Sequence, residues 1–234
     1  MVWGMALPRG FGDFFPGGNF VGWREELTQY FREKMPAEQK ALFADDVSSY
    51  RYYVAENFTY EPGIKLNADL PPFGPIAAHE APKCFETEKR YSSLGSLIEL
   101  NDRIVAVDGP MKDIIERHEP GKHHFFPIEI VMPKKVIYPQ RYFVMAIGQY
   151  LDSFSLEQSD PGSWRESSDK EFGFFEDTKK AMSGLALSKR VFGDVHLWRE
   201  RRMLSPLICF SEQLRSEFIA SGLRLPKLYP LKEV

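Results

Sequence analysis

The stretch Ile104-Val105-Ala106-Val107-Asp108-Gly109-Pro110-Met111 returns in altered form as Leu207-Ile208-Cys209-Phe210-Ser211-Glu212-Gln213-Leu214. Each stretch leads, at the same spacing, to an aromatic-Pro-aliphatic run: Phe126-Pro127-Ile128 in the first and Tyr229-Pro230-Leu231 in the second. Residues 104–131 and 207–234 therefore align without a gap. Such self-similarity predicts an internal repeat.

Each copy of the repeat has the pattern of a strand, a helix and a second strand. A short apolar run is followed by a residue that can cap a helix, Asp108 or Ser211, and the helix is expected to end at Gly121 or Gly222. We expect helices over about 109–118 and 212–221. Their apolar faces are predicted to contain Met111, Ile114, Ile115 and His118 in the first copy, and Leu214, Phe218 and Ile219 in the second.

Proline limits where the closing strands can lie. Pro127 and Pro230 have no N–H to donate, so each is expected at a strand start, a bulge or an unpaired edge. One copy alone is too small to bury its own apolar face, and we expect the two copies to share a core.

These patterns predict an α+β fold with a mixed, mainly antiparallel sheet or pair of sheets on which the two repeat helices pack. Residues 1–95, with eight of the 17 prolines, form an irregular, helical N-terminal part, and residues 96–234 form the repeat domain. We expect the two parts to make one compact unit. In the N-terminal part the sequence predicts helices over Gly22–Met35 and Ala37–Phe43, and a strand over Ser49–Tyr60.

Composition excludes several classes of protein. The 234 residues have a net charge of −3, which provides no basic field for nucleic acid or anionic lipid. No signal peptide or membrane-spanning run is readable, so the expected location is the cytoplasm. Two cysteines, Cys84 and Cys209, are too few for a disulfide framework, although one bridge or a redox role stays open.

The strongest local charge lies in residues 157–177, which hold seven acidic and two basic side chains, before a basic block at 178–202. Clustered charge of this kind steers association with an oppositely charged partner. The alternatives are a solvated loop, or a segment paired with the basic block. We predict a partner-binding surface made by Asp160, Trp164, Glu166, Asp169, Glu171, Glu176 and Asp177.

No catalytic signature is present. The HExxH, GxSxG and P-loop patterns are absent, and the cluster of His118, His123 and His124 lacks metal-ligand spacing, because neighbouring strand residues point to opposite sides. Cys209 lies in an apolar run typical of a packing residue, and no base is evident beside Cys84. We therefore assign no catalytic residue, no metal ligand and no cofactor.

The segment from about Leu94 to Val234 resembles the bacterial polymorphic-toxin immunity proteins of the eleventh immunity family, formerly a domain of unknown function. The likeness rests on the Phe125–Ile130 strand, the strand with Tyr142, and three further motifs: His196-Leu197-Trp198-Arg199, Ser211-Glu212-Gln213-Leu214 with Gly222, and Tyr229-Pro230-Leu231. The resemblance implies a cytoplasmic, non-catalytic protein that binds a cognate toxin encoded beside it and neutralises it.

Two other hypotheses stay open at this point. A hydrolase or transferase could use carboxylates such as Glu99, Asp102 and Glu129 if they converged in a cleft. A self-associating structural module is the third possibility, because the sequence leaves the oligomeric state open.

Overall fold

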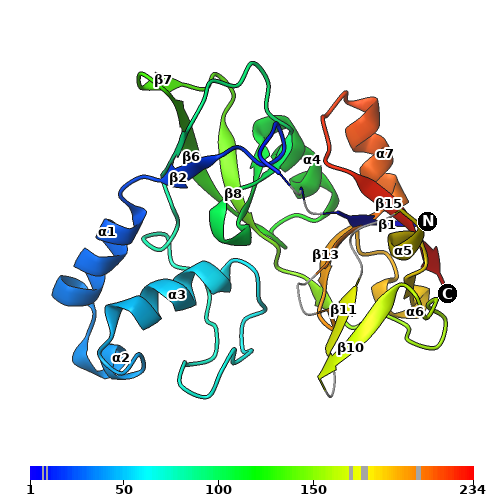
Figure 1. The fold of residues 1–234 in the computed structure, drawn as a ribbon, viewed down its shortest axis with the longest axis horizontal. Coiled ribbons are helices and arrows are strands. Elements are labelled where there is room, and N and C mark those ends of the chain that lie inside the picture. The colour runs from blue at the N-terminus through cyan, green and yellow to red at the C-terminus, as the bar shows by residue number, and fades with distance from the viewer. Residues whose placement is uncertain (7, 9, 169–170, 175–178, 204–206) are drawn as a thin grey trace.

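The computed structural model describes residues 1–6, 8, 10–168, 171–174, 179–203 and 207–234. The described chain forms two large β-sheets and a separate two-stranded hairpin, with helices beside and between the sheets (Figure 1). Most strand pairs are antiparallel, and the parallel pairs lie near the sheet margins. The α+β prediction is confirmed.

The first sheet belongs to the first copy of the repeat. Its strands follow the order β2-β3-β6-β8-β5-β4, and β7 extends the sheet by pairing with β6. The bounds are β2 (Gly18–Phe20), β3 (Cys84–Thr87), β4 (Leu97–Glu99), β5 (Val105–Asp108), β6 (His124–Met132), β7 (Val136–Ile137) and β8 (Tyr142–Ala146).

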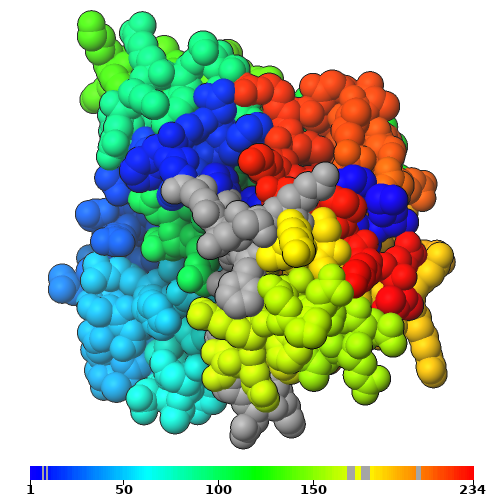
Figure 2. Space-filling model, turned by 45° about the vertical axis from the view of Figure 1, so that its right-hand side comes forward, coloured from blue at the N-terminus to red at the C-terminus, as the bar shows by residue number. Residues whose placement is uncertain are grey.

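The second sheet belongs to the second copy, and its order is β12-β15-β1-β14-β13-β9. The bounds are β1 (Val2–Met5), β9 (Tyr150–Leu151), β12 (Ala186–Leu187), β13 (Leu197–Glu200), β14 (Leu207–Ser211) and β15 (Leu228–Glu233). Because β1 pairs with both β14 and β15, the two ends of the chain lie side by side (Figure 2).

The predicted repeat is present as two equivalent units, β5-α4-β6 and β14-α7-β15, with α4 at Gly109–His118 and α7 at Glu212–Ala220. In each unit the two strands run parallel to each other on either side of a third, antiparallel strand. That third strand is β8 in the first unit and β1 in the second. The same three-stranded arrangement is thus completed in the first unit by a strand that follows the unit in the chain, and in the second unit by the N-terminal strand.

The helix boundaries follow the predicted caps. Met111 N–H donates to the Asp108 carboxylate at 2.9 Å, and Leu214 N–H donates to the Ser211 hydroxyl at 3.2 Å. Gly121 and Gly222 have φ of 68° and 69°, which glycine adopts without the strain that a side chain would add.

The predicted apolar faces are correct with one exception. Met111, Ile114 and Ile115 of α4 are buried, as are Leu214 and Phe218 of α7. Ile219 was expected in the core but is 51% exposed. It directly follows Phe218 on the helix, and a rotation of about 100° per residue carries it off the buried face.

The prolines lie where one side of their strand has no partner. Pro127 is paired with Phe143 of β8, while β3, on the other side of β6, pairs only with residues 129–131. Pro230 is likewise paired with Trp3, and β12 pairs only with residues 232–233. Both prolines are therefore at locally unpaired edges, as expected.

Removing either cap is expected to weaken its helix. Asp108→Ala or Ser211→Ala takes away the acceptor for a first-turn N–H group, and we expect each to lower the free energy of unfolding by about 1 kcal/mol. Asn at either position restores an acceptor and serves as the control. Urea unfolding of the four variants measures the effect, and equal stability of the Ala and Asn variants would contradict the role of the caps.

The N-terminal part contains the predicted helices, as α1 (Trp23–Gln29) continued by the π-helical segment η1 (Tyr30–Lys34), and α2 (Ala37–Ala41). The strand predicted over Ser49–Tyr60 is wrong, because Val47–Asn57 forms the helix α3.

The error has a clear physical origin. Tyr, Val and Phe favour strands when judged by residue type, but here the side chains buried in the core recur at helical spacing. Asp46 also caps α3 by accepting from the N–H groups of Ser48 and Ser49. The buried helix residues are Tyr50, Tyr53, Val54 and Asn57.

Three apolar clusters hold these layers together. One lies between α1–α3 and one face of the first sheet, and a second surrounds α4 and α7 between the sheets. The third lies between the other face of the second sheet and the segment from Phe154 to Met203. That segment contains β10 (Trp164–Ser168), β11 (Glu171–Phe174), α5 (Lys179–Ser183) and α6 (Lys189–Phe192), while the 3-10 turn η2 (Asn101–Arg103) follows β4.

Candidate functional site

The acidic segment singled out in the sequence contains the hairpin β10–β11, which projects from the second half of the molecule (Figure 1). The segment contains a turn at residues 160–163, in which Ser163 N–H donates to Asp160 O at 2.9 Å. Glu166 is exposed on β10. Asp169, Glu176 and Asp177 lie outside the described residues, as does the side chain of Glu171.

Two of the predicted contact residues have partners within the chain. The Asp160 carboxylate accepts from Lys232 Nζ at 2.6 Å, and Lys232 belongs to β15 rather than to the basic block. Trp164 packs edge-on against Phe154 and Phe172, with ring centroids 6.4 and 5.6 Å away. Trp198, by contrast, is fully buried in the core.

Arg202 attaches the hairpin to the second sheet. Its guanidinium lies 4.9 Å from the Phe172 ring centroid, and its carbonyl accepts from Phe172 N–H at 2.9 Å. The guanidinium also donates to Phe154 O at 3.0 Å. The aromatic side chains of the hairpin therefore attach it to the rest of the chain. Its exposed charged side chains are the groups that can contact a partner.

The carboxylates considered for a hydrolase or transferase do not line one cleft. Glu99 is buried in β4. Asp102 lines a hollow of about 260 Å³ beside α1 and α3, whereas Glu129 lines a different hollow of about 750 Å³ on the first sheet. The arrangement gives these three residues no shared substrate position.

The histidines take part in separate contacts. His118 Nε2 lies 2.6 Å from Glu217, joining α4 to α7, and the His123 ring lies 2.9 Å from Glu119. His123, directly before β6, is buried, while His124, the first residue of β6, is exposed. Within the described residues no group of three or more His, Cys, Asp or Glu side chains is placed to hold a metal ion.

Neither cysteine is set up as a nucleophile. Burial, followed by the charges of Glu129 and Glu86, raises the pKa of the Cys84 thiol. Burial raises the pKa of Cys209 well above its usual value. Both thiols are therefore protonated at neutral pH, and a thiol attacks far more slowly than a thiolate.

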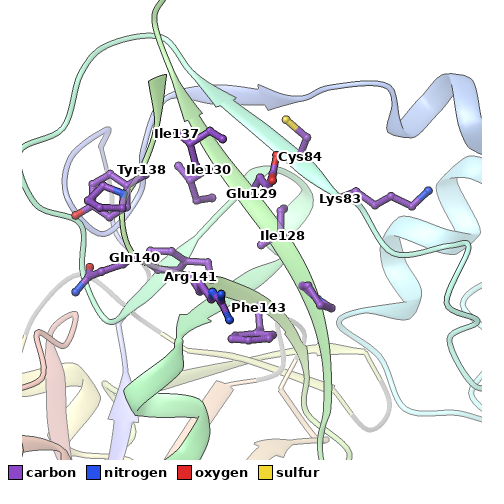
Figure 3. Close-up of a pocket in the computed structure, with 13 residues that line it drawn as sticks. Lys83, Cys84, Ile128, Glu129, Ile130, Ile137, Tyr138, Gln140, Arg141 and Phe143 are labelled. Carbon is purple, nitrogen blue, oxygen red and sulfur yellow. The ribbon is translucent and has the colours of Figure 1, made fainter. Parts of the chain in front are cut away.

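The larger hollow lies on the face of the first sheet that is turned away from α1–α3 (Figure 3). Strand alternation places Cys84, Pro127, Glu129 and Phe143 on this face, because Cys84 pairs with Glu129 and Pro127 with Phe143. Ile137 of β7 shares the face through its pairing with Val131.

The chain between β7 and β8 forms one wall of this hollow. After Tyr138 N–H donates to Ile130 O at 2.8 Å, residues 139–141 leave the ladder before β8 rejoins it at Tyr142. Pro139 cannot donate to a strand, which favours this departure. The irregular segment brings Gln140 and Arg141 to the rim of the hollow (Figure 3).

Sequence reasoning did not identify this surface. The alternation in Pro127-Ile128-Glu129-Ile130 indicates which side chains share a face of the sheet. It does not indicate that the face on which α4 packs is left uncovered at these residues. Whether this face is covered depends on how far α4 extends over the sheet, and tertiary packing decides that.

The comparisons with known proteins match residues 34–230 to the Immunity protein family (Imm11). The chain belongs to this family. A search of curated proteins found no match. The Imm11 match begins well before Leu94, where the resemblance in the sequence became readable, so α2, α3 and the proline-rich stretch are part of the family domain.

No helix among the described residues combines the length and apolar composition needed to cross a membrane.

Proposed function

We propose that this Imm11 protein binds a cognate bacterial toxin domain stoichiometrically and neutralises it without catalysis, in the cytoplasm and without nucleic acid or membrane as partner. Membership of the immunity family is the observation that carries the proposal. The separate positions of Glu99, Asp102 and Glu129 and the protonated thiols support the non-catalytic part of it.

The scaffold is suited to an inhibitor of this kind. Rigid surfaces bind with less loss of conformational entropy than mobile ones, and here two sheets are locked around a shared core of α4 and α7. Surface groups can then be held ready for the toxin by elements that do not need to rearrange.

Co-expression with the toxin domain encoded by the neighbouring gene tests the proposal. We expect growth to be rescued and a one-to-one complex to be measurable by calorimetry with the purified proteins. Substoichiometric protection would instead indicate turnover, and absence of both binding and rescue would refute the proposed function.

We further propose that residues 157–177 form an electrostatic contact surface for a basic region of the toxin, on which Glu157 and Glu166 are exposed in the described part. Reversing both charges, Glu157→Lys and Glu166→Lys, is expected to slow association about 3–10-fold at low salt, with a smaller effect at high salt. Stopped-flow association rates measure this.

The matched control is Glu38→Lys together with Glu33→Lys, two exposed glutamates of the N-terminal helical part. Equal slowing by both pairs would show an effect of net charge alone and would remove the special role of the hairpin.

A further inference from the structure

The open face of the first sheet carries side chains that the fold does not use. Helix α4 covers Val105, Val107 and Met145 but stops at Phe143, over whose ring the α4 residue Lys112 lies, 5.5 Å from the centroid. Beyond that point no helix among the described residues shields Pro127 and Glu129 of β6, which are exposed.

Apolar side chains gather around the hollow on this face. Ile137 is 59% exposed, on the short strand β7 that projects at one end of the molecule (Figure 1). Phe143 is half-buried beside exposed Pro127. Exposed apolar groups that surround a hollow with a few polar groups are typical of protein interaction sites.

Cationic side chains lie at the rim of the hollow and in the turn beside β7. Lys134 and Lys135 occupy the turn between β6 and β7, and Arg141 lies where the chain returns to β8. None of these three side chains has an ion-pair partner among the residues that the structure describes, whereas Lys83 on the opposite rim is held by Glu26 at 2.6 Å. The hollow therefore combines an apolar lining with the exposed Glu129 carboxylate on β6 and, at its rim, the Arg141 cation.

The turn itself is held in an unusual conformation. Lys134 and Lys135 have φ of 67° and 57°, values that residues with side chains rarely adopt. A turn with these dihedral angles matches the right-handed twist of a tight hairpin. It therefore holds the backbone that carries the two lysine side chains and Ile137 in a defined conformation.

From this geometry we propose that the hollow formed by β3, β6, β7 and β8 is the anchor site for the toxin: it receives a toxin loop that presents an apolar side chain next to a carboxylate. The apolar side chain enters between Ile137 and Phe143, and the carboxylate pairs with Arg141, whose planar guanidinium can bind it through two hydrogen bonds. The inference rests on the proposed function.

This surface is separate from the acidic hairpin. The strands β7 and β10–β11 lie toward opposite ends of the view in Figure 1, so one compact toxin loop cannot contact both. The aromatic groups of the hairpin are used within the chain, while Ile137 and Pro127 at the hollow are exposed. We therefore expect the hollow to determine the dissociation rate, and the hairpin to affect mainly the association rate.

Two pairs of variants test the proposal against the toxin encoded by the neighbouring gene. Ile137→Arg and Arg141→Glu change exposed side chains of the hollow, and each is expected to weaken the complex at least tenfold, mainly through faster dissociation. The matched controls are Ile219→Arg, at the other strongly exposed isoleucine, and Arg190→Glu on α6. We expect these to stay within about threefold of the unsubstituted protein.

A second measurement requires no substitution. Amide hydrogen exchange of the unsubstituted protein should slow at residues 134–143 when the toxin binds. If the complex forms while the hollow variants keep full affinity and this segment shows no protection, the anchor site is refuted and the proposed function stands. If the unsubstituted protein itself does not bind the toxin, both are refuted.

Discussion

Glu119→Ala is expected to lower the free energy of unfolding by about 3–5 kcal/mol, the range found when one partner of a buried charged network is removed. Glu119 is buried at the C-terminal end of α4 and accepts four hydrogen bonds. They come from the His123 ring at 2.9 Å, the Gln149 amide at 2.8 Å, and the backbone N–H groups of His196 and Leu197 at 2.7 and 3.1 Å.

This carboxylate joins the two copies of the repeat. Its own helix belongs to the first copy, while Leu197 begins β13 of the second sheet and His196 directly precedes it. Gly148 N–H donates to Nδ1 of His123, so Nε2 carries the proton that is donated to Glu119. Removal of the carboxylate leaves all four donors without this acceptor in a buried place.

Burial alone would raise the pKa of Glu119, but the hydrogen bonds from His123, His196 and Gln149 outweigh it and hold the pKa below its usual value. The folded state thus binds this proton less tightly than the unfolded state. The contribution of Glu119 is therefore complete above the ordinary glutamate pKa of about 4.5 and is lost as the pH falls.

Urea unfolding at pH 7 measures the effect, with Glu116→Ala as the control. Glu116 lies on the same helix without a hydrogen-bond or ion-pair partner among the described residues, and its loss is expected to change stability by no more than about 0.5 kcal/mol. Similar losses for the two variants would mean that Glu119 does not join the repeats.

The second large effect concerns Glu200, at the end of β13. One of its carboxylate oxygens accepts from Ser153 N–H at 2.8 Å, from the Ser153 hydroxyl at 2.5 Å and from Phe154 N–H at 3.0 Å. The other accepts from Arg202 N–H at 3.2 Å. Complete burial nevertheless raises the pKa of Glu200 from 4.5 to about 7, and the negative charge of Asp152 adds to the shift.

A raised pKa means that the folded state binds the proton more tightly than the unfolded state does. Stability from this group is therefore complete below pH 4.5 and is lost as the pH rises through 7. The shift corresponds to about 3 kcal/mol between these limits. We expect the stability difference between the unsubstituted protein and Glu200→Gln to change by this amount from pH 4.5 to 8.

Unfolding curves at several pH values measure that difference, and Glu157→Gln, at an exposed glutamate, is the control. A Glu200→Gln difference that is the same at every pH would show that Glu200 is ionised in the folded protein throughout. Because Glu200 orders Ser153 and Arg202 beside the acidic hairpin, the same measurement bears on how firmly that hairpin is held.

The strand-helix-strand repeat could be predicted from the sequence because its signals are local. The caps at Asp108 and Ser211, the stops at Gly121 and Gly222, and the apolar spacing of α4 act within a few residues of the chain. The same local logic failed at α3, where aromatic and β-branched residues masked a helical spacing that packing against the first sheet selects.

The candidate site depends on contacts between residues that lie far apart in the chain. Alternation along β6 showed that Pro127 and Glu129 share a face, but whether that face is covered depends on the reach of α4 and the departure of residues 139–141 from the ladder. Likewise, the acidic character of residues 157–177 was evident, yet only the folded chain shows that Asp160 is paired with Lys232.

By itself, then, the sequence determined the repeated unit, its helix limits and the absence of a recognisable catalytic motif, since these follow from neighbouring residues. The tertiary structure alone decided that β1 and β8, from distant parts of the chain, complete the two units, and that Glu119 joins them. The reason is physical: strand pairing and burial link residues far apart in the chain, and no local pattern records which of the possible partners fits the shared core.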